Sequence, residues 1–203
     1  MLTDHPDIQL FTQSLQQIYR CDFNDSALLA RQFSVRSLAE KGHLIEAGQV
    51  AQEVFFIAEG ILRIYYIDRE GNEANQQFYQ SGEVIAPVFS LTTSEPSPFY
   101  LQALTPARVL VADYQKLHLA GEDNLAWLRV ENALLKAVFL KTARREAQML
   151  LGDAEQRYRW FLKENPQLAE QLPLYQIASY LGVTPVSLSR VRKKLSQSLA
   201  KTD

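Results

Sequence analysis

Hydroxyl and cationic side chains recur near the C-terminus of this 203-residue chain, where the sequence reads TPVSLSRVRKK from Thr184 to Lys194. A helix turning about 100° per residue would place Leu188 and Val191 on one side and a polar face on the other. Arginine can make a two-pronged contact with guanine, hydroxyl groups can reach bases or phosphates, and lysine suits phosphate as a point charge. The pattern indicates a surface for double-stranded DNA, formed by Thr184, Ser187, Ser189, Arg190, Lys193 and Lys194.

The residues before this face end one helix and begin another. Apolar residues stand at helical spacing over Leu174–Leu181, and Gly182 permits the positive φ of a short turn. Thr184 suits the N-cap of the next helix, and Pro185 suits its first position, where the missing N–H costs nothing. Ala178 is small where the two helices would cross. This spacing predicts a helix-turn-helix.

Charge is distributed unevenly along the chain, whose formal net charge is −2. From Glu155 onward there are eight Lys or Arg and four Asp or Glu, a net charge of +4, so residues 1–154 carry −6. A basic module on an acidic body indicates an anionic polymer as partner, with a merely solvated helix face as the alternative. Residues 171–202 contain no acid and five cations: Arg190, Arg192, Lys193, Lys194 and Lys201.

One long helix is predicted for residues 124–150, which contain no Gly or Pro. Its apolar residues form two stripes, one of which contains Leu128, Leu135 and Phe139. A helix that is apolar on two sides must bury both. The same helix of a second chain is the simplest cover for one of them, and cover from within the monomer is the alternative. We expect a homodimer whose interface contains the other stripe: Val130, Ala133, Ala137, Leu140 and Ala147.

Short β-branched and aromatic runs separated by turn residues replace the helical period in the middle of the chain. They predict a small antiparallel barrel or roll, and helical stretches over residues 7–38 precede it. The expected class is α+β, in three parts. These are N-terminal helices and a β-roll (1–120), the long helix (121–151) and a helix-turn-helix domain resembling a winged helix (152–203). The runs lie at residues 54–57, 61–67, 99–103 and 109–111.

Other chemistry finds little support in the sequence. The histidines His5, His43 and His118 are widely separated, and Cys21 is the single cysteine, so neither a metal site nor a cofactor is expected. No candidate nucleophile has a positioned base nearby, which argues against an enzyme. The chain shows neither a cationic leader nor a long apolar run, and we expect a cytoplasmic protein.

The chain resembles the Crp/Fnr family of bacterial transcription regulators. The resemblance implies a jelly roll like that of cyclic nucleotide-binding proteins, which senses a ligand or contacts RNA polymerase. It also implies a homodimer along the long helix, with one recognition helix per DNA half-site in the major groove. The residues that carry the resemblance are EQRYRWFL at 155–162, the segment 174–195, and Gly48, Gly60, Gly71 and Gly82-Glu83.

The roll departs from the members that bind cyclic AMP. Those members carry a Gly-Glu pair followed by Arg-Ser or Arg-Thr, where this chain has residues 86–89 (APVF) and 97–99 (SPF). Residues 70–107 contain no Lys or Arg, although Arg63, Arg69 and Arg108 stand on neighbouring segments. We therefore expect no cyclic AMP binding through the usual cassette, and the effector stays unknown. Five aromatic residues either fill the pocket or line a site for a more apolar molecule: Phe78, Tyr79, Phe89, Phe99 and Tyr100.

The recognition helix departs as well. Pro185-Val186 stand where many members carry a base-reading Arg-Glu pair, whereas Arg190 matches the family's next arginine. The operator sequence therefore stays open. Because the chain ends at Asp203, we expect it to lack a full β-hairpin wing. A ligand-binding module without DNA activity is the alternative function, against which the basic C-terminus argues.

Overall fold

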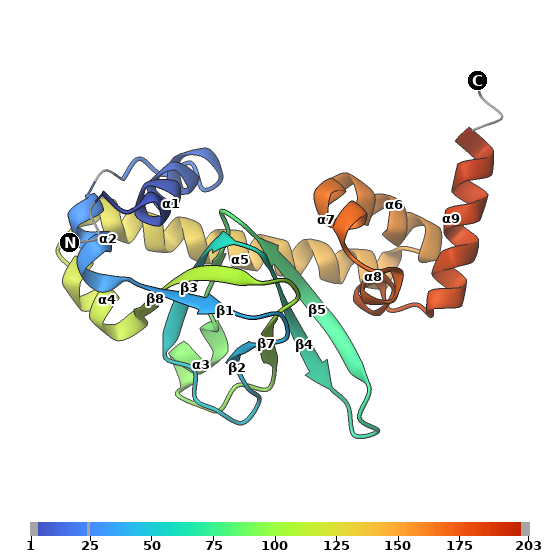
Figure 1. Cartoon of the computed structure of the whole chain (residues 1–203), viewed down its shortest axis with the longest axis horizontal. Coiled ribbons are helices and arrows are strands. Elements are labelled where there is room, and N and C mark those ends of the chain that lie inside the picture. The colour runs from blue at the N-terminus through green and yellow to red at the C-terminus, as the bar shows by residue number, and fades with distance from the viewer. Residues whose placement is uncertain (1–3, 24, 200–203) are drawn as a thin grey trace. The chain divides into compact units, whose positions relative to one another are not determined.

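The computed structural model describes residues 4–23 and 25–199, without the side chains of residues 198 and 199 (Figure 1). The chain forms two compact units. The first comprises the described part of Met1–Tyr66 together with Gln77–Phe139, and the second comprises Ile67–Gln76 together with the described part of Leu140–Asp203. The predicted α+β class is confirmed. The predicted boundaries after residues 120 and 151 stay predictions.

Eight strands form a roll of two four-stranded antiparallel sheets, with the orders β1-β8-β3-β6 and β2-β7-β4-β5. The four runs identified in the sequence lie in β3, β4, β7 and β8, because their β-branched and aromatic residues suit a pleated, half-buried surface. The strands are β1 Ser34–Leu38, β2 His43–Ile45, β3 Glu53–Glu59, β4 Ile61–Ile67, β5 Glu73–Gln80, β6 Val84–Ile85, β7 Tyr100–Ala103 and β8 Ala107–Asp113.

Alternation along the strands creates two apolar clusters. On β3, Phe55 and Ile57 are buried between the two sheets, whereas Val54 and Phe56 belong to a cluster on the outer face of their sheet. Successive side chains of a strand point to opposite faces, so one strand serves both clusters. Helices cover the outer cluster: α1 Pro6–Gln17, α2 Ser26–Gln32, α4 Tyr114–Gly121 and the first part of α5 Leu125–Leu151.

Residues 34–38, the last part of the segment in which helical stretches were expected, form strand β1. β1 pairs antiparallel with β8, and Ser34 lies opposite Val111. β8 also pairs with β3 on its other side, so without β1 its N–H and C=O groups would form an open sheet edge. The short range of the helical pattern could not reveal this pairing with a strand more than 70 residues away in the sequence. The expected helical stretches are α1 and α2, which precede β1.

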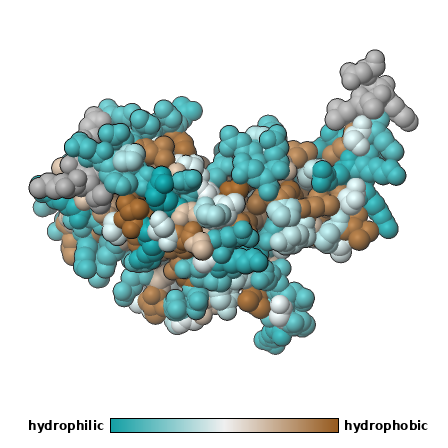
Figure 2. Space-filling model, in the orientation of Figure 1, coloured by the Kyte–Doolittle hydropathy of each residue, from teal (hydrophilic) through white to brown (hydrophobic). Residues whose placement is uncertain are grey.

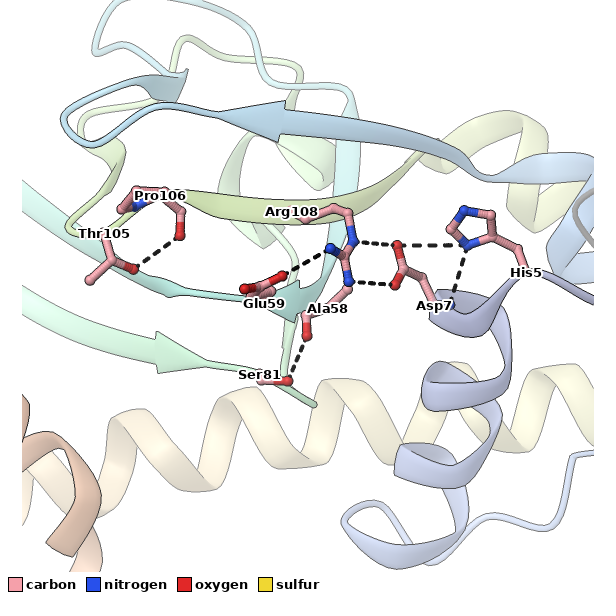
Figure 3. Close-up of polar contacts among 8 residues, drawn as sticks. All are labelled: His5, Asp7, Ala58, Glu59, Ser81, Thr105, Pro106 and Arg108. Carbon is pink, nitrogen blue, oxygen red and sulfur yellow. Dashed lines mark hydrogen bonds and ion pairs between the residues drawn. The ribbon is translucent and has the colours of Figure 1, made fainter.

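An ion pair between Asp7 and Arg108 joins α1 to β8 (Figure 3). The carboxylate of Asp7 is almost fully buried and accepts hydrogen bonds from Arg108, at 2.9 Å from Nε and 3.1 Å from Nη2. The Nη1 of Arg108 donates to Glu59 at 2.9 Å. A buried carboxylate is costly unless it is paired and hydrogen-bonded, and the two-pronged arginine does both. The side chain of Arg108 therefore binds carboxylates on the outer face of the roll and does not point into the space between the sheets.

The glycines that carry the family resemblance occupy backbone positions that other residues rarely adopt. Gly48, Gly60, Gly71 and Gly82 all have positive φ. At Gly60 a side chain is excluded by space as well, because a Cβ there would lie 2.7 Å from the carbonyl oxygen of Pro106. The turns at Gly48, Gly60 and Gly82 carry the chain from one sheet to the other, and the turn at Gly71 joins the neighbouring strands β4 and β5.

The prediction of one long helix is confirmed by α5, but the assignment of its stripes needs correction. Val130 is 0% exposed and lies in the outer cluster beside Trp127, so it cannot contact a second chain. Ala137 follows one heptad later, a drift of only about 20° around the helix, and so shares the inward side. The exposed apolar side of α5 instead contains Leu135 and Phe139, which is 70% exposed.

The second unit contains four further helices and no strand in its described residues after 152. A capping box opens the first of them: Asp153 accepts from the N–H of Gln156 at 2.8 Å, and the Gln156 side chain accepts from the N–H of Asp153 at 2.9 Å. The helices are α6 Ala154–Glu164, α7 Pro166–Gln171, α8 Leu174–Leu181 and α9 Pro185–Leu199. A short helix of the first unit, α3 Val88–Thr93, follows β6.

Candidate nucleic-acid interface

Helices α8 and α9 form the predicted helix-turn-helix (Figure 1). Gly182 adopts the left-handed conformation, with φ 65° and ψ 35°, and its N–H donates to Ser179. The N–H of Val183 donates to the carbonyl of Ala178 at 3.0 Å, so backbone donors take up the last carbonyls of α8. Ala178 is fully buried, as expected for a small residue at the crossing of the two helices.

Thr184 and Ser187 hold the start of α9. The hydroxyl oxygen of Thr184 accepts from the N–H of Ser187 at 3.1 Å, which makes Thr184 the N-cap, and its O–H donates to the Ser187 hydroxyl at 2.9 Å. Leu188 and Leu195 are buried and fix the inward side of the helix. The hydroxyl groups of Thr184 and Ser187 therefore lie together at the N-terminal end of α9.

The opposite side of α9 is exposed and mostly hydrophilic in Figure 2. Ser189, Arg190 and Lys193 are exposed, and among the described residues no ion pair or hydrogen bond engages the side chain of Arg190 or Lys193. Val186 is exposed too, near the start of the helix. Uncommitted cations beside short polar groups can meet phosphates and base edges without first breaking a protein contact.

Among the six residues predicted to bind DNA, Lys194 differs because its side chain forms an ion pair within the protein. Its Nζ lies 2.8 Å from Glu155 Oε2, and Arg159 lies 3.0 Å from the other oxygen of the same carboxylate. The hydrogen bonds from Lys194 and then Arg159 hold the pKa of Glu155 below its usual range. Lys194 is therefore turned toward α6. Lys201, the last cation of the basic segment, lies outside the described residues.

Arg157 supports the helix-turn-helix in a way that the sequence did not reveal. Its guanidinium donates to three backbone carbonyls, those of Met149 at 2.8 Å, Gly152 at 2.9 Å and Leu181 at 3.1 Å. Two of these belong to the last turns of α5 and α8, where carbonyls have no partner within their own helix. One side chain thus caps two helices. The only signal in the sequence is an arginine shortly after a helix end.

The segment 67–76 also contacts α8 within the second unit. Asn75 is buried, and its Nδ2 donates to the Gln176 side chain at 2.6 Å and to the Gln176 carbonyl at 3.0 Å. The N–H of Asn75 donates to the Ser179 hydroxyl at 3.0 Å. Arg145 donates to the carbonyl of Tyr180 at 2.9 Å and lies over its ring. These polar contacts attach α8, the first helix of the helix-turn-helix, to the segment 67–76 and to Arg145 of α5.

The space between the two sheets is occupied by side chains of the roll. Tyr79 and Phe99 are buried there, whereas Phe89 is largely exposed. Arg63, one of the three cations on segments next to residues 70–107, is buried with its guanidinium over the ring of Tyr65 and 2.7 Å from the side-chain oxygen of Gln102. The sequence left two alternatives: aromatic side chains fill the pocket of the roll, or they line a site for an apolar molecule. The buried side chains between the sheets favour the first.

The histidines do not converge. His5 caps α1, His43 lies 3.0 Å from the hydroxyl of Tyr65, and His118 lies 3.1 Å from the Glu131 carboxylate. No group of three or more His, Cys, Asp or Glu suited to a metal ion occurs among the residues that the structure describes. Within that same part of the chain, every helix is too short or too polar to cross a membrane.

Comparison with known proteins agrees with this architecture. Residues 35–122 match the cyclic nucleotide-binding domain family. No curated protein sequence matches the chain. Among solved structures, FixK2 from Bradyrhizobium japonicum is similar with a TM-score of 0.70 and 18% identity, over 82% of this chain and 85% of that one. The c-di-GMP responsive global regulator CLP from Xanthomonas campestris has a TM-score of 0.69 and 18% identity, over 86% and 93%.

A transcriptional regulator of the CRP/FNR family from Thermus thermophilus is similar as well, with a TM-score of 0.63 and 15% identity over 81% of this chain and 87% of that one. At such low identity these matches establish the fold. They agree with the roll, the long helix and the helix-turn-helix described above. Residues 35–122 are similar to cyclic nucleotide-binding domains, and the chain has the fold of the Crp/Fnr transcription regulators.

Proposed function

We propose that the protein is a homodimeric, sequence-specific DNA-binding transcription regulator of the Crp/Fnr type, which cyclic AMP does not control through the usual phosphate cassette. The observation that carries the proposal is the exposed face of α9, the second helix of a well-formed helix-turn-helix, where no described residue pairs with the side chain of Arg190 or Lys193. In this motif the second helix enters the major groove and its exposed side chains read the bases.

The roles of the side chains follow from their chemistry. Arg190 can bind guanine through two parallel hydrogen bonds, which specify a base. Lys193 can neutralise a phosphate, which adds affinity for any sequence. Thr184 and Ser187, at the N-terminal end of α9, lie where a helix dipole favours a phosphate. The structures with the same fold that are described as transcription regulators support this assignment.

The homodimer is supported by the exposed apolar side of α5. Leu135 and Phe139 lie about one helical turn apart, and a phenyl ring that is 70% exposed on a 27-residue helix is poorly placed for a single chain. A second copy of α5 would cover it. Twofold symmetry would then present two recognition helices to half-sites about 34 Å apart. Leu140 and Ala147, also exposed, would flank this seam, as would the partly buried Ala133.

The absence of cyclic AMP control is supported by charge. A cyclic phosphate carries a full negative charge, and burying it without a cation is costly. Residues 70–107 supply none, and Arg63 and Arg108 are engaged with Gln102 and Asp7. Calorimetric titration with cyclic AMP tests this directly. Saturable micromolar binding that also tightens operator affinity would refute it.

The DNA-binding proposal is tested by selecting DNA from a random pool and comparing two matched variants by fluorescence anisotropy. Arg190→Ala should cost about 1 to 3 kcal/mol on the selected site and relax one position in each half-site. Lys193→Ala should weaken all DNA alike and flatten the salt dependence by about one unit of log–log slope. Failure to select any sequence would leave the ligand-binding module without DNA activity as the function.

A further inference from the structure

An apolar cavity of about 110 Å³ lies in the first unit, between the outer face of the β1-β8-β3-β6 sheet and helices α3, α4 and α5. Phe56 of the sheet, Leu117 of α4, and Trp127 and Leu134 of α5 contribute to its walls. In another protein, an engineered apolar cavity of roughly 150 Å³ stays free of water and binds benzene. A molecule about the size of one six-membered ring would therefore fit in this cavity.

The cavity borders the space between the two sheets only at Phe55, which belongs to the inter-sheet cluster. Phe56 lines the cavity, whereas the next residue, Ile57, is buried between the sheets. Tyr79 and Phe99, which fill the inter-sheet space, are absent from the walls of the cavity. A molecule in this cavity would contact α3, α4 and α5, and would meet the inter-sheet cluster only at Phe55.

One charged side chain lines this cavity in the described part of the chain. Glu131 is mostly buried, with 13% of its side chain exposed, and its carboxylate lies 3.1 Å from Nδ1 of His118. A carboxylate offers about four lone-pair sites, so a contact with one imidazole leaves acceptor capacity. Trp127 is almost fully buried, and its Nε1 has no hydrogen-bond partner among the described residues.

We propose that this cavity binds a small neutral ring compound that carries one hydroxyl or amine group, and that Glu131 accepts the hydrogen bond from that group. Burial of the ring against the apolar walls provides most of the binding free energy. The carboxylate of Glu131 favours ring compounds with a hydrogen-bond donor over those without one. A carboxylate-bearing ligand would place like charges together at a buried site, which disfavours it. Because the cavity lies in the first unit, the proposal does not rest on DNA binding by α9.

The test is calorimetric titration of the full chain with three ring compounds of similar size. Phenol has the donor, toluene lacks it and benzoate carries a negative charge. We expect saturable binding of phenol, weaker binding of toluene and no binding of benzoate. Glu131→Gln keeps the size of the side chain but removes its charge, so benzoate binding should appear in that variant.

Two leucines on the same helix provide a matched pair for locating the site. Leu134→Phe puts added volume into the cavity and should weaken phenol binding about tenfold or more, which corresponds to about 1.4 kcal/mol. Leu128→Phe makes the same change at a residue that does not line the cavity, and should leave binding unaltered. Circular dichroism shows whether each variant is folded.

Three outcomes would overturn the proposal. The first is no heat with phenol on the folded native chain. The second is phenol binding that Leu134→Phe and Leu128→Phe alter equally, which would place the molecule elsewhere. The third is phenol binding that appears only on dilution below the concentration at which subunits dissociate. That result would show that a second copy of α5, and not a small molecule, occupies the cavity.

Discussion

Lys194 Nζ and Glu155 Oε2 lie 2.8 Å apart and join helix α9 to helix α6. The pair stands at the edge of the proposed DNA surface, where a free lysine would contact phosphate. Glu155 also receives Arg159 at 3.0 Å, so one carboxylate engages two cations of the basic module. On the proposed surface DNA would compete with this carboxylate for Lys194, and Glu155 would limit the affinity for DNA of any sequence.

Replacing Glu155 by Gln should strengthen DNA binding. The change releases Lys194 and removes a negative charge from the neighbourhood of the phosphates. Affinity for selected and random DNA should rise together, and the log–log salt slope should steepen by about one unit. Anisotropy titrations at several salt concentrations measure both. Glu164→Gln, on the same helix but facing Arg144 at 4.0 Å, is the control and should change neither. Weaker DNA binding by Glu155→Gln would show instead that the pair is needed to orient α9.

Replacing Phe139 by Glu should separate the proposed dimer. Twofold symmetry would bring two such carboxylates into one apolar seam, where burial disfavours both charges. Sedimentation should then show monomers. Val130→Ala is the matched control, because Val130 is 0% exposed within the first unit. It should lower the free energy of unfolding by about 2 kcal/mol without changing assembly. A native chain that is monomeric at micromolar concentration would contradict the dimer.

Gly121→Ala should destabilise the protein although it places a better helix former in α4. A Cβ at this position would overlap Cδ1 of the Trp127 indole, which packs directly on the glycine. The helix propensity of Ala contributes at most about 1 kcal/mol, whereas overpacking a buried ring costs about 1 to 3 kcal/mol. Denaturant unfolding measures the net change. In a Trp127→Phe background the cost of Gly121→Ala should shrink, and equal costs in both backgrounds would exclude the overlap as the cause.

Tyr19 should make the protein sensitive to alkali. Its hydroxyl accepts the N–H of Val84 at 2.7 Å, and burial raises its pKa above the usual value. The neutral phenol is therefore favoured in the folded state, so this stabilisation is complete below about pH 10 and is lost as pH rises further. Tyr19→Phe should be less stable near neutral pH, with a difference that narrows above pH 10. Urea unfolding at a series of pH values checks this, and a constant difference would contradict it.

Elements with local signals could be predicted from the sequence. Gly182, Thr184 and Pro185 specify the turn and the start of α9 within four residues, and Asp153 with Gln156 specifies the start of α6. Each of these residues acts on backbone groups next to it. The same holds for the turns of the roll, where glycine is required by a positive φ.

Elements defined by distant partners could not be predicted. Both stripes of α5 are apolar, so their composition does not show which one faces the roll, and Val130 was assigned to the wrong side. The β1 strand exists because β8 offers an edge, and Asn75 contacts Gln176 across about a hundred residues of sequence. The contact between Lys194 and Glu155 depends in the same way on how α6 and α9 pack. Periodicity carries no information on such pairings.

The three carbonyls held by Arg157 make the geometry of this side chain as important as its charge. A guanidinium is a planar fork with donors that point in several fixed directions, whereas a lysine has one nitrogen at the end of a flexible stem. Lysine at this position would keep the positive charge but reach the end of α5 or the end of α8, not both together. The helix-turn-helix would then alternate between two attachments, and its recognition helix would no longer be held in one orientation toward the proposed half-site.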